Sequence, residues 1–295
     1  MGILDDIKRS FNKGNSLTQL IYINIGAFIV ISFAAIIGFL LTNPLIDETV
    51  LKFLAVPASL QELVIKPWTI ITYMFLHKDV WHILFNMLWL YWFGKIFLQM
   101  LDQRKLVAVY LIGGICGAIL YIVSFNIFPA FKEIVNESVA IGASASVLAV
   151  VVAIAAYTPD YSINLLLFGR VKIKYMALAI FVLTSFMDFS VNSGVKLAHI
   201  GGAVFGYVYA MKLIQGRDLG KGVNKIIDFF ATIFKPRKKL KVTYKKPVND
   251  YEYNNIKADR QAKINAILDK ISKGGYDSLT REEKDALFRE SQNKN

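Results

Sequence analysis

Long apolar runs are the feature that most constrains how this chain folds. Hydrophobic residues make up 55% of its 295 residues, and they concentrate in stretches that end near residue 214. An α-helix needs about 20 predominantly apolar residues to cross a bilayer, and several stretches reach or approach that length. A soluble domain of this size is usually less apolar, so the runs predict a helical membrane protein.

Six segments have the composition of membrane spans. The pattern predicts an all-α polytopic membrane protein whose six transmembrane helices are Gln19–Leu41, Val80–Leu98, Leu106–Phe128, Ile141–Tyr157, Tyr175–Phe189 and Leu197–Leu213. The first run is too long for the core of a signal peptide and no clear cleavage site follows it, so we interpret it as an uncleaved span. The one cysteine, Cys116, excludes an internal disulfide and is typical of a small packing residue.

Basic residues in the loops predict the orientation. They follow the second span (Arg104, Lys105), the fourth span (Arg170, Lys172, Lys174) and the sixth span. Because basic loops stay on the cytoplasmic side, we expect a multi-pass protein of the cell (inner) membrane with both termini in the cytoplasm. This topology also accounts for the net charge of +12, and we expect no nucleic-acid partner.

Composition divides the chain into four regions. These are a cytoplasmic segment (1–18), a membrane domain (19–213), an amphipathic and polybasic juxtamembrane segment (214–246), and a linker with a small helical tail (247–295). Lys235–Lys246 holds seven basic residues and suits anionic lipid at about 1 kcal/mol per residue, although a solvated topology anchor explains it equally well. In the tail, Gly274–Gly275 ends one predicted helix and a capping box at Thr280–Glu283 begins another.

The loop between the first two spans, Thr42–Asp79, is long and partly apolar. Its amphipathic stretches and Trp68 predict short helices in the outer membrane interface.

Polar residues recur at one depth of the predicted bundle. His82 and Asn86 lie in the first turns of the second span, Ser144 in the first turn of the fourth, and His199 in the first turn of the sixth. These three spans all run from outside to inside. At 1.5 Å per residue, the four side chains fall within about 10 Å of the outer helix ends. Because polar groups in lipid are costly, we interpret them as one shallow site.

Their chemistry suits nucleophilic catalysis. A serine needs a base, usually histidine, and Ser144 has two candidates in His82 and His199. His82 and Asn86 share a helix face at i and i+4, where both can donate to a developing oxyanion. Singly, each residue is more often a packing or wetted interfacial residue, and we assign a packing role to Ser146.

Small residues accompany the candidates. Gly142 precedes Ser144, and Gly201–Gly202 follows His199. The sixth span also carries Gly202 and Gly206, at the small-xxx-small spacing of close helix contacts.

On these residues the sequence resembles the rhomboid intramembrane serine proteases, over residues ~66–213. "HILFNMLWL" carries His-x-x-x-Asn at His82 and Asn86, "GAS" carries Gly-x-Ser at Gly142–Ser144, and "AHIGGAVFG" carries Ala-His-x-x-Gly-x-x-x-Gly at Ala198–Gly206. The resemblance implies a six-helix rhomboid bundle with an interfacial first outer loop.

The resemblance also assigns roles. It implies that Ser144 is the nucleophile and His199 its base, and that His82, Asn86 and the Ser144 N–H form the oxyanion hole. The supporting residues are Gly142, Ala145, Gly202, Gly206, His77 and Trp68. It implies no cofactor and no metal, a site open to the extracytoplasmic side, and single-span or multi-span membrane proteins as substrates.

Several positions depart from the family pattern. Ala145 stands where the family usually has glycine, Leu148 where many relatives have a tyrosine that packs on the base, and Thr69 where relatives often have arginine. Asp188, near the outer end of the fifth span, is a minority candidate for a third catalytic residue. We otherwise interpret it as a helix-end or packing residue.

Two other function classes are alternatives for such a sequence. A non-catalytic rhomboid-like factor that binds membrane proteins is the main alternative; such relatives usually lack the serine or the histidine, and both are present here. A transporter or channel predicts charged residues deep in the spans and interrupted helices in related halves, neither of which the sequence has.

Overall fold

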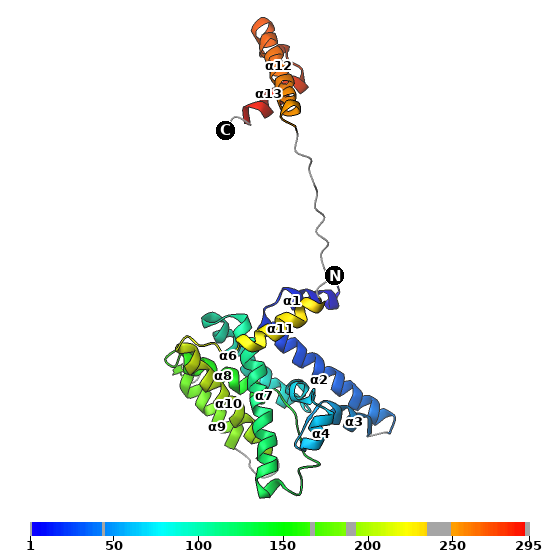
Figure 1. Ribbon diagram of the computed structural model, residues 1–295, viewed down its shortest axis with the longest axis vertical. Helices are drawn as coiled ribbons and strands as arrows, with labels where there is room; N and C mark the ends of the chain where they lie inside the picture. Colours follow the sequence, from blue (N-terminus) through cyan, green and yellow to red (C-terminus); the bar gives the residue numbers. More distant parts are fainter. Residues whose placement is uncertain (1, 43–44, 166–168, 187–192, 235–248, 293–295) are drawn as a thin grey trace. The chain divides into compact units, whose positions relative to one another are not determined.

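The structure is a computed structural model that describes residues 2–42, 45–165, 169–186, 193–234 and 249–292. Asp188 and the polybasic segment Lys235–Lys246 therefore lie outside the described residues. Helices make up about 79% of the protein. The chain forms two compact units, Met1–Lys235 and Pro236–Asn295, and each is described by itself (Figure 1).

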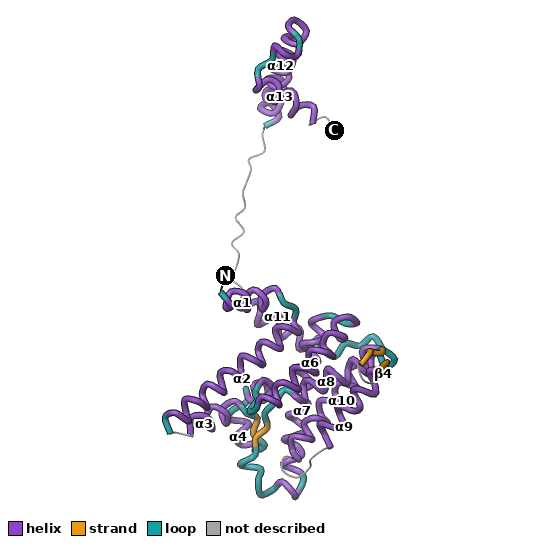
Figure 2. The backbone as a smooth tube through the Cα atoms, turned by 180° about the vertical axis from the view of Figure 1, so that it is seen from behind, coloured by secondary structure: helices purple, strands orange, loops and turns teal. Residues whose placement is uncertain are grey.

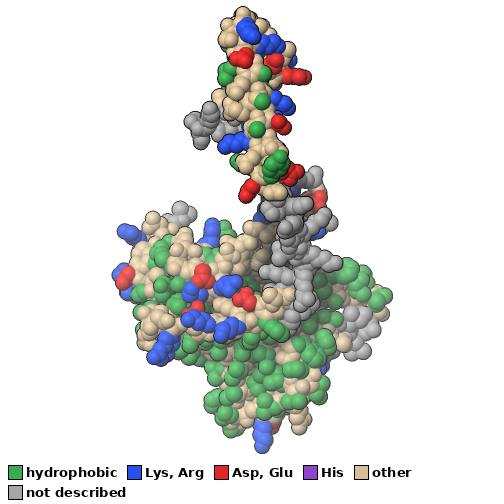
Figure 3. Space-filling view, turned by 45° about the horizontal axis from the view of Figure 1, so that its top comes forward, with side chains coloured by type: hydrophobic (Ala, Val, Ile, Leu, Met, Phe, Trp, Pro, Cys, Tyr) green, Lys and Arg blue, Asp and Glu red, His purple; other side chains and the backbone are tan. Residues whose placement is uncertain are grey.

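The first unit is built from long apolar helices. They are α2 (Ser16–Leu40), α6 (Val80–Met100), α7 (Gln103–Ile127), α8 (Ser144–Tyr157), α9 (Ile173–Phe186) and α10 (Ser193–Ile214). In the described chain, α2, α6, α7 and α10 are long and apolar enough to cross a membrane, whereas α8 and α9 are shorter apolar helices of 14 residues each. On α2 most apolar side chains face outward, such as Val30, which is 66% exposed. Figure 3 shows a broad hydrophobic surface with charged side chains gathered to one side.

Five of the six helices start two to four residues away from the predicted position, and α6 begins where predicted, at Val80. The fourth begins at Ser144, three residues later than predicted, because Gly142 has φ +123°, which a helix excludes, and Val139–Ala140 pair as a strand. The sixth begins at Ser193 rather than Leu197. Side-chain caps fix other starts: Asp79 accepts the His82 N–H at 2.7 Å and so begins α6 at Val80.

The buried helix α8 is the centre of the packing. It contacts α6, α7, α9 and α10, and α10 also packs along α7. Val150, Val151 and Ile154 of α8 are all fully buried. Helices α2 and α9 lie at opposite edges of the unit (Figures 1 and 2).

Short elements fill the segment between α2 and α6. They are α3 (Leu45–Leu54), α4 (Leu60–Ile65), α5 (Thr69–Thr72) and the 3₁₀ turn η1 (Tyr73–Phe75). Between α3 and α4, β1 (Val56–Pro57) pairs antiparallel with β2 (Val139–Ala140), with Val56 opposite Ala140. This two-stranded ribbon was not predicted. It ties the first long loop to the residues just before α8, and a second 3₁₀ turn, η2 (Pro129–Phe131), directly follows α7.

A second hairpin, β3 (Ser162–Leu165) with β4 (Gly169–Lys172), connects α8 to α9. Just before it, the exposed Asp160 carboxylate contacts Lys172 at 2.8 Å and Lys174 at 3.2 Å. These two lysines hold the pKa of Asp160 below its ordinary value. The amphipathic helices α1 (Ile3–Lys13) and α11 (Lys221–Phe234) complete the unit.

The second unit is a pair of helices, α12 (Asp250–Gly274) and α13 (Arg281–Gln292), joined through the 3₁₀ turn η3 (Tyr276–Ser278). The predicted glycine stop is confirmed, because α12 ends at Gly274 and Gly275 has φ +74°. The predicted capping box is confirmed too: Thr280 and Glu283 exchange side-chain to main-chain hydrogen bonds of 2.7 and 3.3 Å.

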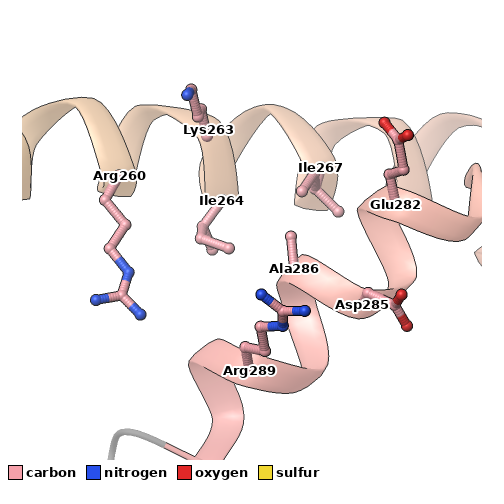
Figure 4. A pocket seen from close by; sticks show the side chains of 8 residues that line it. All are labelled: Arg260, Lys263, Ile264, Ile267, Glu282, Asp285, Ala286 and Arg289. Atoms are coloured by element: carbon pink, nitrogen blue, oxygen red, sulfur yellow. The ribbon is translucent and has the colours of Figure 1, made fainter.

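A cleft of about 410 Å³ lies between α12 and α13. Figure 4 shows Ile264 and Ile267 of α12 facing Ala286 of α13, with Arg260 and Arg289 at one end. This cleft belongs to the second unit and shares no residue with the predicted site.

Candidate active site

Ser144 and His199 meet at the predicted end of the bundle. Ser144 is the first residue of α8, and His199 lies in the second turn of α10. The distance from His199 Nε2 to Ser144 Oγ is 2.6 Å. His199 is 7% exposed and Ser144 is half-buried, so the pair is largely shielded while the serine keeps some access.

Close contact between α8 and α10 brings the two residues together. A Cβ added to Gly202 would lie 2.1 Å from the Ala145 carbonyl oxygen, and one added to Gly206 would lie 2.3 Å from the Ala149 oxygen. The two helices therefore touch backbone to backbone one turn below the Ser144–His199 pair. Ala145 itself is buried and its Cβ fills the space next to Gly117 of α7.

The hydrogen bonds of His199 define its tautomer. His199 Nδ1 lies 3.0 Å from the main-chain oxygen of Thr184, near the end of α9. A carbonyl oxygen accepts hydrogen bonds only, so Nδ1 must carry the proton. In the neutral ring Nε2 is then an acceptor, and the Ser144 hydroxyl donates to it. This is the arrangement that a general base needs toward its nucleophile.

His82 lies beside the same serine. A Cβ added to Gly142 would lie 3.0 Å from His82 Nε2 and 3.6 Å from Ser144 Oγ, so both side chains flank this glycine. Gly142 has φ +123°, which residues with a Cβ rarely adopt, and its N–H donates to the Tyr73 oxygen at 3.0 Å. A glycine is therefore needed here for its backbone conformation and for the space that His82 occupies.

Asn86 and His77 contact each other next to His82. The Asn86 amide donates to the His82 oxygen at 3.0 Å, and the same nitrogen lies 3.3 Å from His77 Nε2. His77 is fully buried in the connection before α6, and its pKa is lowered to about 4 by burial and by the nearby His82. A neutral His77 accepts at Nε2, so both N–H groups of the Asn86 amide are engaged. His77 thus orients Asn86.

Other predicted residues lie elsewhere. Trp68 bridges α3 and α5, since its Nε1–H donates to the Phe53 oxygen at 2.9 Å and its ring packs on the Phe53 ring. The neighbouring Thr69 is buried and donates to the Lys66 oxygen. Ser146 is buried against Met74, 3.7 Å from its sulfur, as a packing residue would be.

No residue type pointed to the Thr184 carbonyl, because every residue presents the same main-chain acceptor. Leu148, at the position of the family's tyrosine, is buried and 2% exposed. Within the described ranges, no group of three or more His, Cys, Asp or Glu side chains is placed to hold a metal ion.

The family described as "Rhomboid domain" matches residues 65–216, about half of the chain. The chain belongs to the rhomboid family. The match covers α6 to α10 and therefore includes Ser144 and His199. Rhomboid domains are generally those of intramembrane serine proteases, and the family also includes inactive members.

The second unit matches a different family. Residues 249–293 match a "Family of unknown function" (DUF6576), which coincides with α12 and α13. A search of curated proteins found no match. The rhomboid assignment and the apolar helices make the protein an all-α membrane protein.

Proposed function

We propose that this rhomboid protein is an intramembrane serine endopeptidase that hydrolyses peptide bonds in or next to transmembrane segments of other membrane proteins. Ser144 is the nucleophile and His199 the general base. The observation that carries the proposal is the 2.6 Å contact between Ser144 Oγ and His199 Nε2, with the Nδ1 proton already directed at a carbonyl.

In the first step, Ser144 Oγ attacks the substrate carbonyl carbon while its proton passes to His199 Nε2. His199 then gives that proton to the leaving amine as the peptide bond breaks and an acyl-enzyme forms. A water molecule attacks the ester, its proton passes through His199 to Ser144, and the acid product leaves.

Three donors surround the oxygen that becomes negative. Ser144 is the first residue of α8, so its own N–H has no acceptor within the helix, and the helix N-terminus favours negative charge. His82 flanks the same glycine as Ser144. Asn86 joins them when one of its amide hydrogens turns from His77 to the oxyanion.

The proposed topology has six spans, α2 and α6 to α10, with residues 1–18 and the region after Ile214 on the cytoplasmic side. The starts of α6, α8 and α10 then face the extracytoplasmic side, where water reaches Ser144. A substrate span must unwind locally, because a helix engages its carbonyls in i→i−4 bonds. Single-span and multi-span proteins with helix-destabilising residues near that depth are the expected substrates, and the bilayer, with anionic lipid at Lys235–Lys246, is the other expected partner.

The second candidate function is a non-catalytic factor that binds membrane proteins. The observation in its favour is the departure from the family pattern at Ala145 and Leu148. The intact Ser144–His199 pair favours the protease.

Reconstituted protein tests the proposal. Wild type, Ser144→Ala and the matched control Ser146→Ala are incubated with single-span membrane proteins in liposomes, and cleavage products are identified by mass spectrometry. We expect cleavage and fluorophosphonate labelling by wild type and Ser146→Ala, none by Ser144→Ala, and a loss of about 10²–10³-fold for Asn86→Ala. Full cleavage by Ser144→Ala would falsify the assignment, and no labelling of wild type would favour the binding factor.

A further inference from the structure

The end of α9 supplies a main-chain contact to His199 whose role in the reaction the mechanism above does not explain. Helix α9 ends at Phe186, and the last four carbonyls of an α-helix have no partner within the helix. Among the described residues, Thr184 lies in the last turn of α9, and its oxygen meets donors from another element. It lies 3.0 Å from His199 Nδ1 on α10.

The same oxygen has a second donor. Lys196 Nζ lies 3.3 Å from it, and Lys196 precedes His199 by one helical turn. A carbonyl oxygen has two lone pairs and accepts both hydrogen bonds. The end of α9 is thereby fixed against the segment of α10 that carries the base.

The Thr184 side chain leaves the carbonyl free for this task. Its hydroxyl donates backward to the Ile180 oxygen at 2.7 Å, within α9. The contact to His199 is therefore made by the main chain, and residue type at 184 does not determine it.

We propose that the main-chain carbonyl of Thr184 is the positioning group for His199, in the place where other serine hydrolases use a carboxylate side chain. It holds the proton on Nδ1, so that Nε2 is left to accept from Ser144. As part of the negative end of the α9 dipole, it also stabilises the imidazolium that forms during attack. This inference rests on the proposed protease function for its role, although its geometry stands independently.

The chain allows a direct spectroscopic test, because it contains only three histidines. In full-length protein labelled with ¹⁵N-histidine, the ¹⁵N shifts and couplings distinguish Nδ1–H from Nε2–H rings, and His199→Ala identifies the relevant signals. We expect His199 to be the Nδ1–H tautomer. An Nε2–H ring in the folded wild type overturns the proposal.

A backbone change then tests the function of the contact. Replacing residue 185 by the α-hydroxy analogue of alanine turns the Thr184 carbonyl into an ester carbonyl, which is a weaker acceptor. The parent is Ser185→Ala, since the Ser185 hydroxyl is buried and makes no hydrogen bond to any described residue. The matched control places the same ester at residue 183, which weakens the carbonyl of the outward-facing Val182 instead.

We expect the residue-185 ester to lower the rate of fluorophosphonate labelling of Ser144 by about tenfold, since a hydrogen bond to the charged imidazolium is stronger than one between neutral groups and the ester weakens it without removing it. The Nε2–H tautomer should appear in its spectrum, and the residue-183 ester should change neither. If the two esters have the same labelling rate and the same His199 tautomer, the proposal is overturned. If wild type carries Nδ1–H but neither labels nor cleaves, the protease function is wrong while the positioning contact stands.

Discussion

Substituting Gly202 by alanine tests how closely the chemistry depends on helix packing. Gly202 lies on the face of α10 that touches α8, three residues after His199. A Cβ there would lie 2.1 Å from the Ala145 oxygen and 2.8 Å from the Ala145 carbonyl carbon. Both contacts are to backbone, so no side chain can rotate away, and the two helices must separate.

The size of the effect follows from these distances. Ordinary contacts begin near 3.4 Å, so the helices must move apart by roughly 1 Å, at a stability cost of about 1–3 kcal/mol. Ala145 adjoins Ser144, and the same shift lengthens the 2.6 Å hydrogen bond to His199 beyond hydrogen-bonding range. A 1 Å misplacement costs about 10²-fold in rate, which corresponds to about 2.7 kcal/mol in activation free energy.

The assay measures the rate of fluorophosphonate labelling at Ser144 together with the thermal unfolding midpoint in detergent. Gly206→Ala makes a similar backbone clash, 2.3 Å from the Ala149 oxygen, but about 6 Å further along α10. It should lose comparable stability and less activity. The matched control is Gly26→Ala on α2, where an added Cβ meets nothing within 4 Å; it should keep the wild-type labelling rate and should not lower the melting midpoint, because alanine favours a helix over glycine.

The proposed dependence of the chemistry on helix packing fails if Gly202→Ala keeps the wild-type melting midpoint and the wild-type labelling rate. It also fails if Gly206→Ala loses more activity than Gly202→Ala, since displacement at the pair must then arise elsewhere than at the nearest backbone contact.

Three further outcomes follow from single contacts. His77→Leu removes an acceptor of the Asn86 amide, so substrate cleavage should fall by less than the ~10²-fold expected for loss of an oxyanion donor; unchanged cleavage contradicts this role. Asn24→Ala removes buried hydrogen bonds between α2 and α7 and should lower the unfolding free energy by about 1–3 kcal/mol, measured by chemical denaturation in detergent. In the second unit, a main-chain N–H and Lys270 hold the pKa of Glu283 below its ordinary value of 4.5; this stabilisation is therefore complete above pH 4.5 and is lost as pH falls below it. Hydrogen exchange of α13, corrected for intrinsic rates, should show the loss in wild type and not in Glu283→Gln.

The sequence alone allowed a prediction of which polar side chains lie at the same depth of the helix bundle. Ser144 and His199 lie near the starts of two helices that begin at the same end of the bundle. Their depth therefore followed from counting residues along each span. The small residues at 202 and 206 marked the face on which α10 approaches α8. Periodicity and residue type carry this information directly, which is why the shared depth needed no coordinates.

Main-chain geometry could not be predicted in the same way. The prediction that Ile141–Ala143 are helical was wrong, because a positive φ at Gly142 and the β1–β2 pairing stop the helix. The strand β1 that pairs with β2 lies more than 80 residues away in sequence. Trp68 was expected in the first outer loop with a supporting role, but the sequence did not indicate that its indole N–H bonds to the Phe53 oxygen of α3. The carbonyl of Thr184 is a further case, because any residue at that position presents the same acceptor.

The neutral character of that acceptor suits a site in a membrane. An ionised carboxylate beside His199 would have to be kept desolvated among apolar helices, at a cost of several kcal/mol unless it is fully paired. A carbonyl at a helix end carries only a partial charge and is already unpaired within its helix, so it orients the imidazole without burying a new ion. The residue at position 148 then does not have to hydrogen-bond to His199, and Leu148 needs only to pack. An apolar residue at that position is therefore compatible with a working Ser144–His199 pair.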